Sequence, residues 1–113
     1  MSNPHLRILV VASCPHTAHG LSYLLRFWGY PKQAVTDGPG ALETARSFQP
    51  HVVLLALPGG VELARHIRRQ QTRPVLLVGL TEDEAGFDVA LTQRDSQQLR
   101  VLLASASVGV FNR

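Results

Sequence analysis

The fold class can be predicted from the ten residues His51–Gly60, HVVLLALPGG. This stretch holds an unbroken apolar run from Val52 to Leu57, preceded by Pro50 and followed by the turn-forming string Pro58-Gly59-Gly60. An apolar run of this length, rich in branched side chains and bounded by turn residues, is typical of a strand buried on both faces. Such a strand normally lies in the middle of a parallel sheet that is covered by helices. The stretch therefore predicts an α/β fold.

Other segments repeat this pattern on both sides of the central strand. Strands are predicted over four further segments, Leu6–Ala12, Pro31–Thr36, Pro74–Leu80 and Val89–Thr92. Apolar residues at three- and four-residue steps predict helices between and after them, over His16–Trp28, Pro39–Phe48, Val61–Gln70 and Gln97–Ala106. We expect a single domain over residues 1–113, with its core at about 6–106 and a loose tail over Ser107–Arg113. Alternating strands and helices indicate a parallel sheet between two helical layers.

The connection between the last two predicted strands is unusually short. Only Thr81–Asp88 separates Leu80 from Val89, whereas a crossover between parallel strands usually needs a dozen or more residues. Either Val89–Thr92 is not a regular parallel strand, or a loop replaces the crossover helix. In both cases we expect apolar sheet beside Val75–Leu80 to be left exposed and covered by a second subunit.

Composition excludes several classes of protein. The 113 residues include one cysteine, Cys14, so no internal disulfide forms, and a reducing cytoplasm is the expected compartment. No apolar run reaches the roughly 18 residues of a membrane span, and the apolar run at Ile8–Ala12 is too short for a secretory signal. A net charge of +3 permits contact with nucleic acid without arguing for it.

Several strings, taken together, resemble one family. They are RILVVASC at 7–14, LLRFWGY at 24–30, TDGPGALETARSFQPHVVLLA at 36–56, VELARHIRR at 61–69, LLVGLT at 76–81 and AGFD at 85–88. Over about residues 6–104 the chain resembles a response-regulator receiver domain, the CheY-like module of two-component signalling. The resemblance implies a flavodoxin-like three-layer sandwich with strand order 2-1-3-4-5. The helix between strands 4 and 5 is then missing or reduced to a loop.

The family's chemistry implies a set of groups that this chain has largely lost. Receivers transfer a phosphoryl group to an aspartate with the help of magnesium, which a pair of acidic residues holds. The acidic pair matches Ala12 and Ser13, and the phosphoacceptor matches Ala56. The family's lysine matches Gln93, and its switch hydroxyl is retained as Thr81. The resemblance therefore predicts a degenerate receiver with no phosphorylation, no magnesium site, no other cofactor and no enzymatic activity.

Two other groups of residues are candidates for binding. Cys14, His16 and His19 have a spacing that metal sites use, but they lack an evident fourth ligand, so we predict no metal site. A basic helix carrying Arg65, Arg68 and Arg69 and an acidic segment carrying Glu82, Asp83 and Glu84 are a candidate interaction surface. Opposite charges of this kind can meet across a dimer interface.

The expected function is a phosphorylation-independent module that binds a signalling protein or a second copy of itself, most simply as a homodimer. Two alternatives remain open. One is a sensor of a small ligand or anion in the emptied pocket, and the other is nucleic-acid contact through the basic helix. We expect no membrane partner.

Overall fold

A computed structural model of the chain describes residues 6–56, 60–70, 75–80, 89–90 and 96–111. The elements in chain order are β1 (Ile8–Ala12), α1 (Pro15–Phe27), β2 (Gln33–Thr36), α2 (Ala41–Phe48), β3 (Val52–Ala56), α3 (Gly60–Gln70), β4 (Leu76–Gly79), β5 (Val89–Ala90) and α4 (Ser96–Phe111). Each predicted strand and helix is present, with ends that shift by a few residues. The main shift is at the end of α4.

The strands form one parallel sheet in the order β2-β1-β3-β4-β5, as the resemblance predicts. The segment His51–Gly60 provides β3, the middle strand. There Leu54 lies between Val10 of β1 and Val78 of β4. The short β5 pairs in parallel with β4 through Val78 and Val89, so it is a regular parallel strand. Residues 81–88, and with them the predicted absence of a crossover helix, lie outside the described residues.

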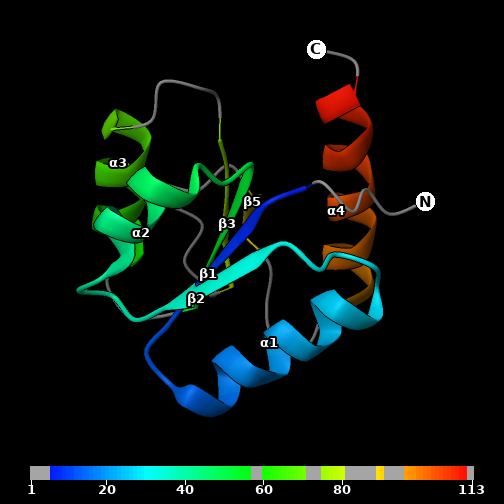
Figure 1. The fold of residues 1–113 in the computed structure, drawn as a ribbon, viewed down its shortest axis with the longest axis horizontal. Helices are drawn as coiled ribbons and strands as arrows, with labels where there is room; N and C mark the ends of the chain where they lie inside the picture. Colours follow the sequence, from blue (N-terminus) through cyan, green and yellow to red (C-terminus); the bar gives the residue numbers. More distant parts are fainter. Residues whose placement is uncertain (1–5, 57–59, 71–74, 81–88, 91–95, 112–113) are drawn as a thin grey trace.

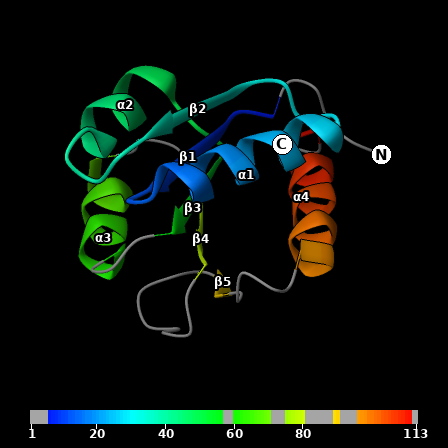
Figure 2. The ribbon, with the colours of Figure 1, turned by 90° about the horizontal axis from the view of Figure 1, so that it is seen from below.

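Two helical layers cover the sheet. Figures 1 and 2 show α1 and α4 on one face and α2 and α3 on the other. Side chains of a strand alternate between the two faces, and β1 follows this rule. Val10 joins the core cluster under α1 and α4, whereas Leu9 and Val11 join the cluster under α2 and α3. All five residues of β1 and of β3 are buried, which confirms that both strands are covered on both sides.

β4 itself is buried, since Val75, Leu77, Val78 and Leu80 are each at most 8% exposed. We expected apolar sheet beside Val75–Leu80 to be exposed, and the side chains of the neighbouring strand β5 lie outside the described residues, so this stays a prediction. Val75 and Leu77 lie in the cluster that α3 covers, and Val78 and Leu80 lie in the cluster that α4 covers. The helices that follow β3 and β5 therefore contribute to the cover of this strand on its two faces.

The predicted loose tail is partly wrong, because α4 continues through Ser107 to Phe111. The spacing of the apolar residues explains the longer helix. Leu99, Leu103 and Ala106 follow a helical period, and Val110 extends it by four residues. Only residues 112 and 113 of the predicted tail lie outside the described residues.

The end of α1 shows how the sequence ends a helix. The Gly29 N–H donates to the Arg26 carbonyl at 3.1 Å, and the Tyr30 N–H donates to the Leu25 carbonyl at 2.8 Å. This pair of bonds is the Schellman motif, which satisfies carbonyls at a helix end and needs a residue with positive φ. Gly29 has φ 93°, which only glycine adopts at little cost. The helix predicted over His16–Trp28 therefore ends, as expected, just before Gly29.

Two glycine substitutions in this region should have opposite effects on stability. Gly29→Ala is expected to lower the free energy of unfolding by about 1 kcal/mol, because an L-residue is strained in the left-handed region. Gly20→Ala should raise it by about 0.5–1 kcal/mol, since alanine favours the helix interior and a Cβ there would meet no atom within 4 Å. Urea unfolding of both variants measures the difference. Equal effects of the two changes would contradict the assigned helix end.

The amino ends of β1 and β3 are joined by side chains as well as by the sheet. His51 Nδ1 accepts the backbone N–H of Arg7 at 2.9 Å. Arg7 Nε in turn donates to the carbonyl of Gln49 at 2.8 Å, where the chain leaves α2 with φ 54°. These bonds fix the entry into the central strand, next to the point where its pairing with β1 starts at Ile8 and Val52.

Candidate functional site

The carboxyl ends of β1 and β3 meet at Ala12 and Ala56. These two alanines are register partners on adjacent parallel strands, which places their backbones about 4.8 Å apart. Ala12 is 6% exposed and Ala56 is 8% exposed. Both belong to the core cluster that α1 and α4 cover. The structure thus brings together two of the predicted site residues, and each offers only a methyl group.

The other predicted residues of this pocket are only partly described. Ser13 follows β1 directly and is exposed. Its hydroxyl lies beside a short turn that leads into α1, which begins at Pro15. Thr81 and Gln93 lie outside the described residues, so their predicted places at the strand ends stay predictions.

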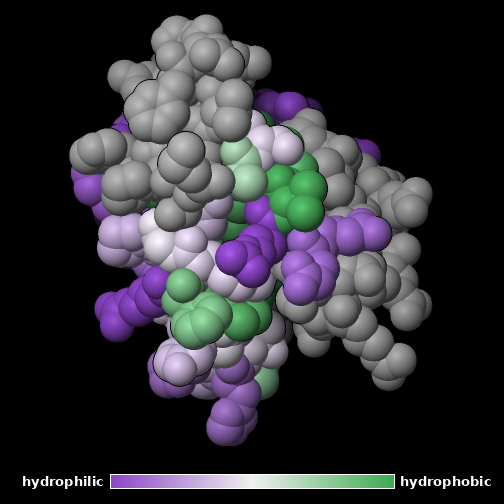
Figure 3. Space-filling model, turned by 90° about the vertical axis from the view of Figure 1, so that its right-hand side faces the viewer, coloured by the Kyte–Doolittle hydropathy of each residue, from purple (hydrophilic) through white to green (hydrophobic). Residues whose placement is uncertain are grey.

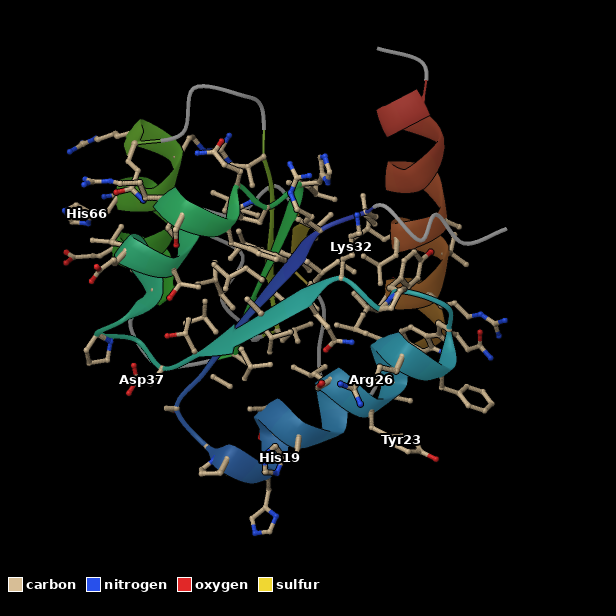
Figure 4. The ribbon with its side chains drawn as sticks, viewed as in Figure 1. His19, Tyr23, Arg26, Lys32, Asp37 and His66 are labelled. Atoms are coloured by element: carbon tan, nitrogen blue, oxygen red, sulfur yellow. The ribbon has the colours of Figure 1, made fainter. Side chains whose placement is uncertain are left out.

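A carboxylate that sequence reasoning overlooked lies at the same edge of the sheet. Asp37 directly follows β2, and its Oδ1 accepts the N–H of Gly40 at 3.1 Å. The side chain is exposed, and Figure 4 shows it at the outer side of the loop that precedes α2. The string Thr36-Asp37-Gly38 before a helix was the available signal, because aspartate in this position accepts a backbone N–H within a turn.

These residues do not fit a magnesium site. Magnesium needs an octahedral set of oxygen ligands, usually with one or two carboxylates. Ala12 and Ala56 provide no oxygen ligand from their side chains, and the Asp37 carboxylate is engaged in its own turn on the edge strand. Among the described residues, the strand ends lack the acidic pair that the family's chemistry requires.

Cys14 is a free thiol that the structure places near this edge. It is the residue before α1 and is exposed. The backbone N–H groups of Thr17 and His16 lower the pKa of the Cys14 thiol, and the Thr17 side chain adds to this effect. These groups act on the sulfur at the amino end of the helix, although no side-chain cap hydrogen bond forms there.

Alkylation should report this lowered pKa. The rate at which iodoacetamide labels Cys14 is expected to rise with pH at a midpoint below that of free cysteine in the same buffer, because the thiolate is the reacting form. Intact-mass measurement at a series of pH values follows the reaction, with Cys14→Ser as the unlabelled control. A midpoint at or above that of free cysteine would contradict the placement of the thiol.

Near Cys14, the two histidines of the candidate metal motif lie on α1. His16 and His19 are both exposed, and Figure 4 shows the His19 ring pointing away from the protein. In the part of the chain that the structure describes, no three His, Cys, Asp or Glu side chains are grouped to hold a metal ion.

The structure describes only the basic half of the candidate interaction surface. Arg65, Arg68 and Arg69 are exposed on α3. Ala64 and Ile67 of the same helix are fully buried against the sheet, so the arginines form the outer side of this layer. The acidic residues Glu82, Asp83 and Glu84 lie outside the described residues. Among the helices described, none is long and apolar enough to cross a membrane.

Known proteins with similar sequences are response regulators. No protein-family model matches the chain. The chain is 35% identical over 95 residues to the DNA-binding response regulator MtrA of Mycolicibacterium smegmatis, an alignment that covers 80% of this chain and 41% of MtrA. The chain therefore spans less than half the length of this curated relative.

Solved structures agree on the fold. The CheY-like response regulator receiver domain from Methylobacillus flagellatus aligns with a TM-score of 0.76 at 22% identity, covering 89% of this chain and 98% of that one. The pseudo-receiver domain of the CikA protein aligns with a TM-score of 0.68 at 23% identity, covering 90% of this chain and 96% of that one. The sequence relatives of the chain are thus response regulators, and its strand order together with these likenesses shows a CheY-like receiver fold.

Proposed function

We propose that the chain is a non-catalytic receiver-type domain that binds a signalling protein without being phosphorylated. The observation that carries the proposal is the pairing of Ala12 with Ala56 at the carboxyl ends of β1 and β3. A methyl group at the acceptor position cannot take up a phosphoryl group, and methyl groups cannot hold the cation that neutralises its oxygens. Ser13 supplies no carboxylate in compensation.

The relatives support a role in signalling. The matched proteins are response regulators, and one of the structural neighbours is described as a pseudo-receiver domain. The receiver fold is thus also found in a domain that is named a pseudo-receiver. Because this chain spans 41% of MtrA, we propose only the role of the domain, and not the activity of the whole relative.

We propose that the partner is a different protein and not a second copy. Exposed sheet near β4 was one of two reasons to expect a homodimer, and Leu77 and Val78 in that strand are 0% exposed. β4 itself therefore offers no apolar surface to a second copy. Interaction is instead expected on a helical face that the single chain leaves exposed.

The two alternative functions have less support. A small-ligand pocket needs accessible surface at the strand ends, and Ala12 and Ala56 are almost fully buried. Nucleic-acid contact is favoured only by Arg65, Arg68 and Arg69, which are exposed on α3. The DNA-binding name of MtrA describes a protein more than twice as long as this chain. A charged outer helix face alone is usually just solvated.

A magnesium titration tests the proposal. Backbone amide resonances of Ala12, Ser13 and Ala56 are followed by NMR as magnesium chloride is added, with sodium chloride at matched ionic strength as the control. We expect no saturable shift at these residues. A saturable shift there, absent with sodium, would overturn the proposal because it would show a working cation site.

A further inference from the structure

Exposed large hydrophobic side chains are unevenly distributed over the two helical layers. Tyr23 is 71% exposed and Phe27 is 76% exposed, both on α1, and Val101 on α4 is 65% exposed. Among the described residues, α2 and α3 on the other face expose no large hydrophobic side chain. The layer of α1 and α4 thus carries apolar groups that the fold itself does not bury.

These side chains are not needed for the core. The side of α1 that faces the sheet is formed by Ala18 and Leu25, with Leu21 packed against the same cluster. Tyr23 and Phe27 are four residues apart and therefore share one face of the helix. Figure 4 shows Tyr23 pointing away from the sheet, with Arg26 on the same helix. An aromatic pair that contributes little to folding is available for binding.

The charged residues within the two helices of this layer have one sign. Neither α1 nor α4 contains an aspartate or a glutamate. Arg26 on α1 and Arg100 on α4 are exposed, and Lys32 is exposed just after α1. By contrast, α3 carries Glu62 along with its arginines. Figure 3 shows the side of the molecule that α4 faces, where hydrophobic surface is interrupted by strongly hydrophilic side chains.

We propose that the α1/α4 face, defined by Tyr23, Phe27, Val101, Arg26 and Arg100, docks an acidic amphipathic segment of another protein. This inference rests on the proposed function and names the surface and the partner chemistry for it. Apolar side chains of the segment cover Tyr23, Phe27 and Val101, and flanking Asp or Glu side chains pair with the arginines. Tyrosine and arginine are the residues that most often dominate binding at interfaces.

The size of the aromatic pair fits such a contact. A buried aromatic side chain removes about 150–250 Å² from water, so Tyr23 and Phe27 together supply about half of the roughly 800 Å² that one partner contributes to a standard interface. A second copy fits this face less well. A two-fold contact would bring two faces without any carboxylate on α1 or α4 together, and like charges across an interface are unfavourable.

A peptide titration tests the docking surface. The probe is a synthetic helical peptide with leucines on one face and glutamates on either side of them, and the controls are the same peptide with lysine in place of each glutamate and a scrambled sequence. We expect the acidic peptide alone to bind with a measurable Kd by fluorescence anisotropy. Its binding should shift amide resonances of α1 and α4 and leave those of α3 unchanged.

Variants locate the contact. The double variant Tyr23→Ser/Phe27→Ser and the single variant Arg26→Glu should each weaken peptide binding by about tenfold or more. The matched control Arg65→Ser/Arg69→Ser on α3 should leave the Kd unchanged. Because all of these side chains are exposed, thermal unfolding should show that the variants fold. Loss of binding in the α3 control, or no loss in the α1 variants, would overturn the proposal.

Two further outcomes would also overturn it. One is the absence of binding by the acidic peptide, or equal binding by its lysine counterpart. The other is a concentration-dependent dimer in sedimentation that Tyr23→Ser/Phe27→Ser abolishes, since a second copy would then occupy the face. Neither outcome bears on the proposed absence of a magnesium site and of phosphorylation, which the magnesium titration and the incubation with acetyl phosphate test separately.

Discussion

Replacing Leu54 with alanine is expected to lower the free energy of unfolding by about 3 kcal/mol. Leu54 is 0% exposed and lies in the middle strand, with Val10 and Val78 as its neighbours on either side. The substitution removes buried methyl groups and leaves a cavity that the neighbouring strands cannot fill without distorting the sheet. In a domain whose total stability is about 5–15 kcal/mol, this is a large fraction.

Urea unfolding followed by circular dichroism measures this loss as a shift of the midpoint at constant m-value. Val101→Ala is the matched control, because Val101 is 65% exposed on α4. It should change the free energy of unfolding by no more than about 0.5 kcal/mol. A loss below about 1 kcal/mol for Leu54→Ala would mean that β3 is not the buried centre of the sheet.

Restoring carboxylates at the strand ends should create a cation site. The variant Ala12→Asp/Ser13→Asp/Ala56→Asp puts three acidic side chains at positions that the register of β1 and β3 brings together. Mutual repulsion of the three should destabilise the variant without metal, and magnesium should relieve it. At ten times its Kd, magnesium is expected to raise the free energy of unfolding by about 1.4 kcal/mol.

The comparison is made by thermal or urea unfolding with and without magnesium, in the variant and in the original chain. The original chain should show no stabilisation beyond that of matched sodium chloride. Ser47→Asp is the control variant, because it adds a carboxylate on the exposed side of α2. Three aspartates at the buried positions Leu9, Val53 and Leu55 would prevent folding, so that variant cannot serve as a control. If magnesium stabilised the original chain as much as the triple variant, the assignment of Ala12 and Ala56 would be wrong.

The layers and the strand order of this fold could be predicted from the sequence. Apolar runs such as Val52–Leu57 identify strands that are buried on both faces, and Gly29 marks a helix end by its need for positive φ. Because both signals arise from local chemistry, they can be read without knowing the rest of the structure. The residues of the emptied site came from the resemblance, and the register of Ala12 with Ala56 agrees with it.

Features that depend on distant contacts could not be predicted in the same way. The side chains of β4 are shared between the cluster that contains α3 residues and the cluster that contains α4 residues, and the short connection to β5 gives no hint of this packing. The bond from the Arg7 N–H to His51 joins residues 44 positions apart, and no local pattern marks it. The aromatic pair on α1 was also missed, because the helical period shows which residues are buried and leaves the outer face undetermined.

The most direct test of the central claim is the intact mass of the chain after incubation with acetyl phosphate and magnesium. A receiver domain with alanine at Ala56, paired with Ala12 on the next strand, should keep its mass unchanged under conditions that phosphorylate an ordinary receiver run in parallel. A stable adduct with the mass of one phosphoryl group, mapped by peptide sequencing to any residue at the carboxyl ends of the strands, would contradict the claim.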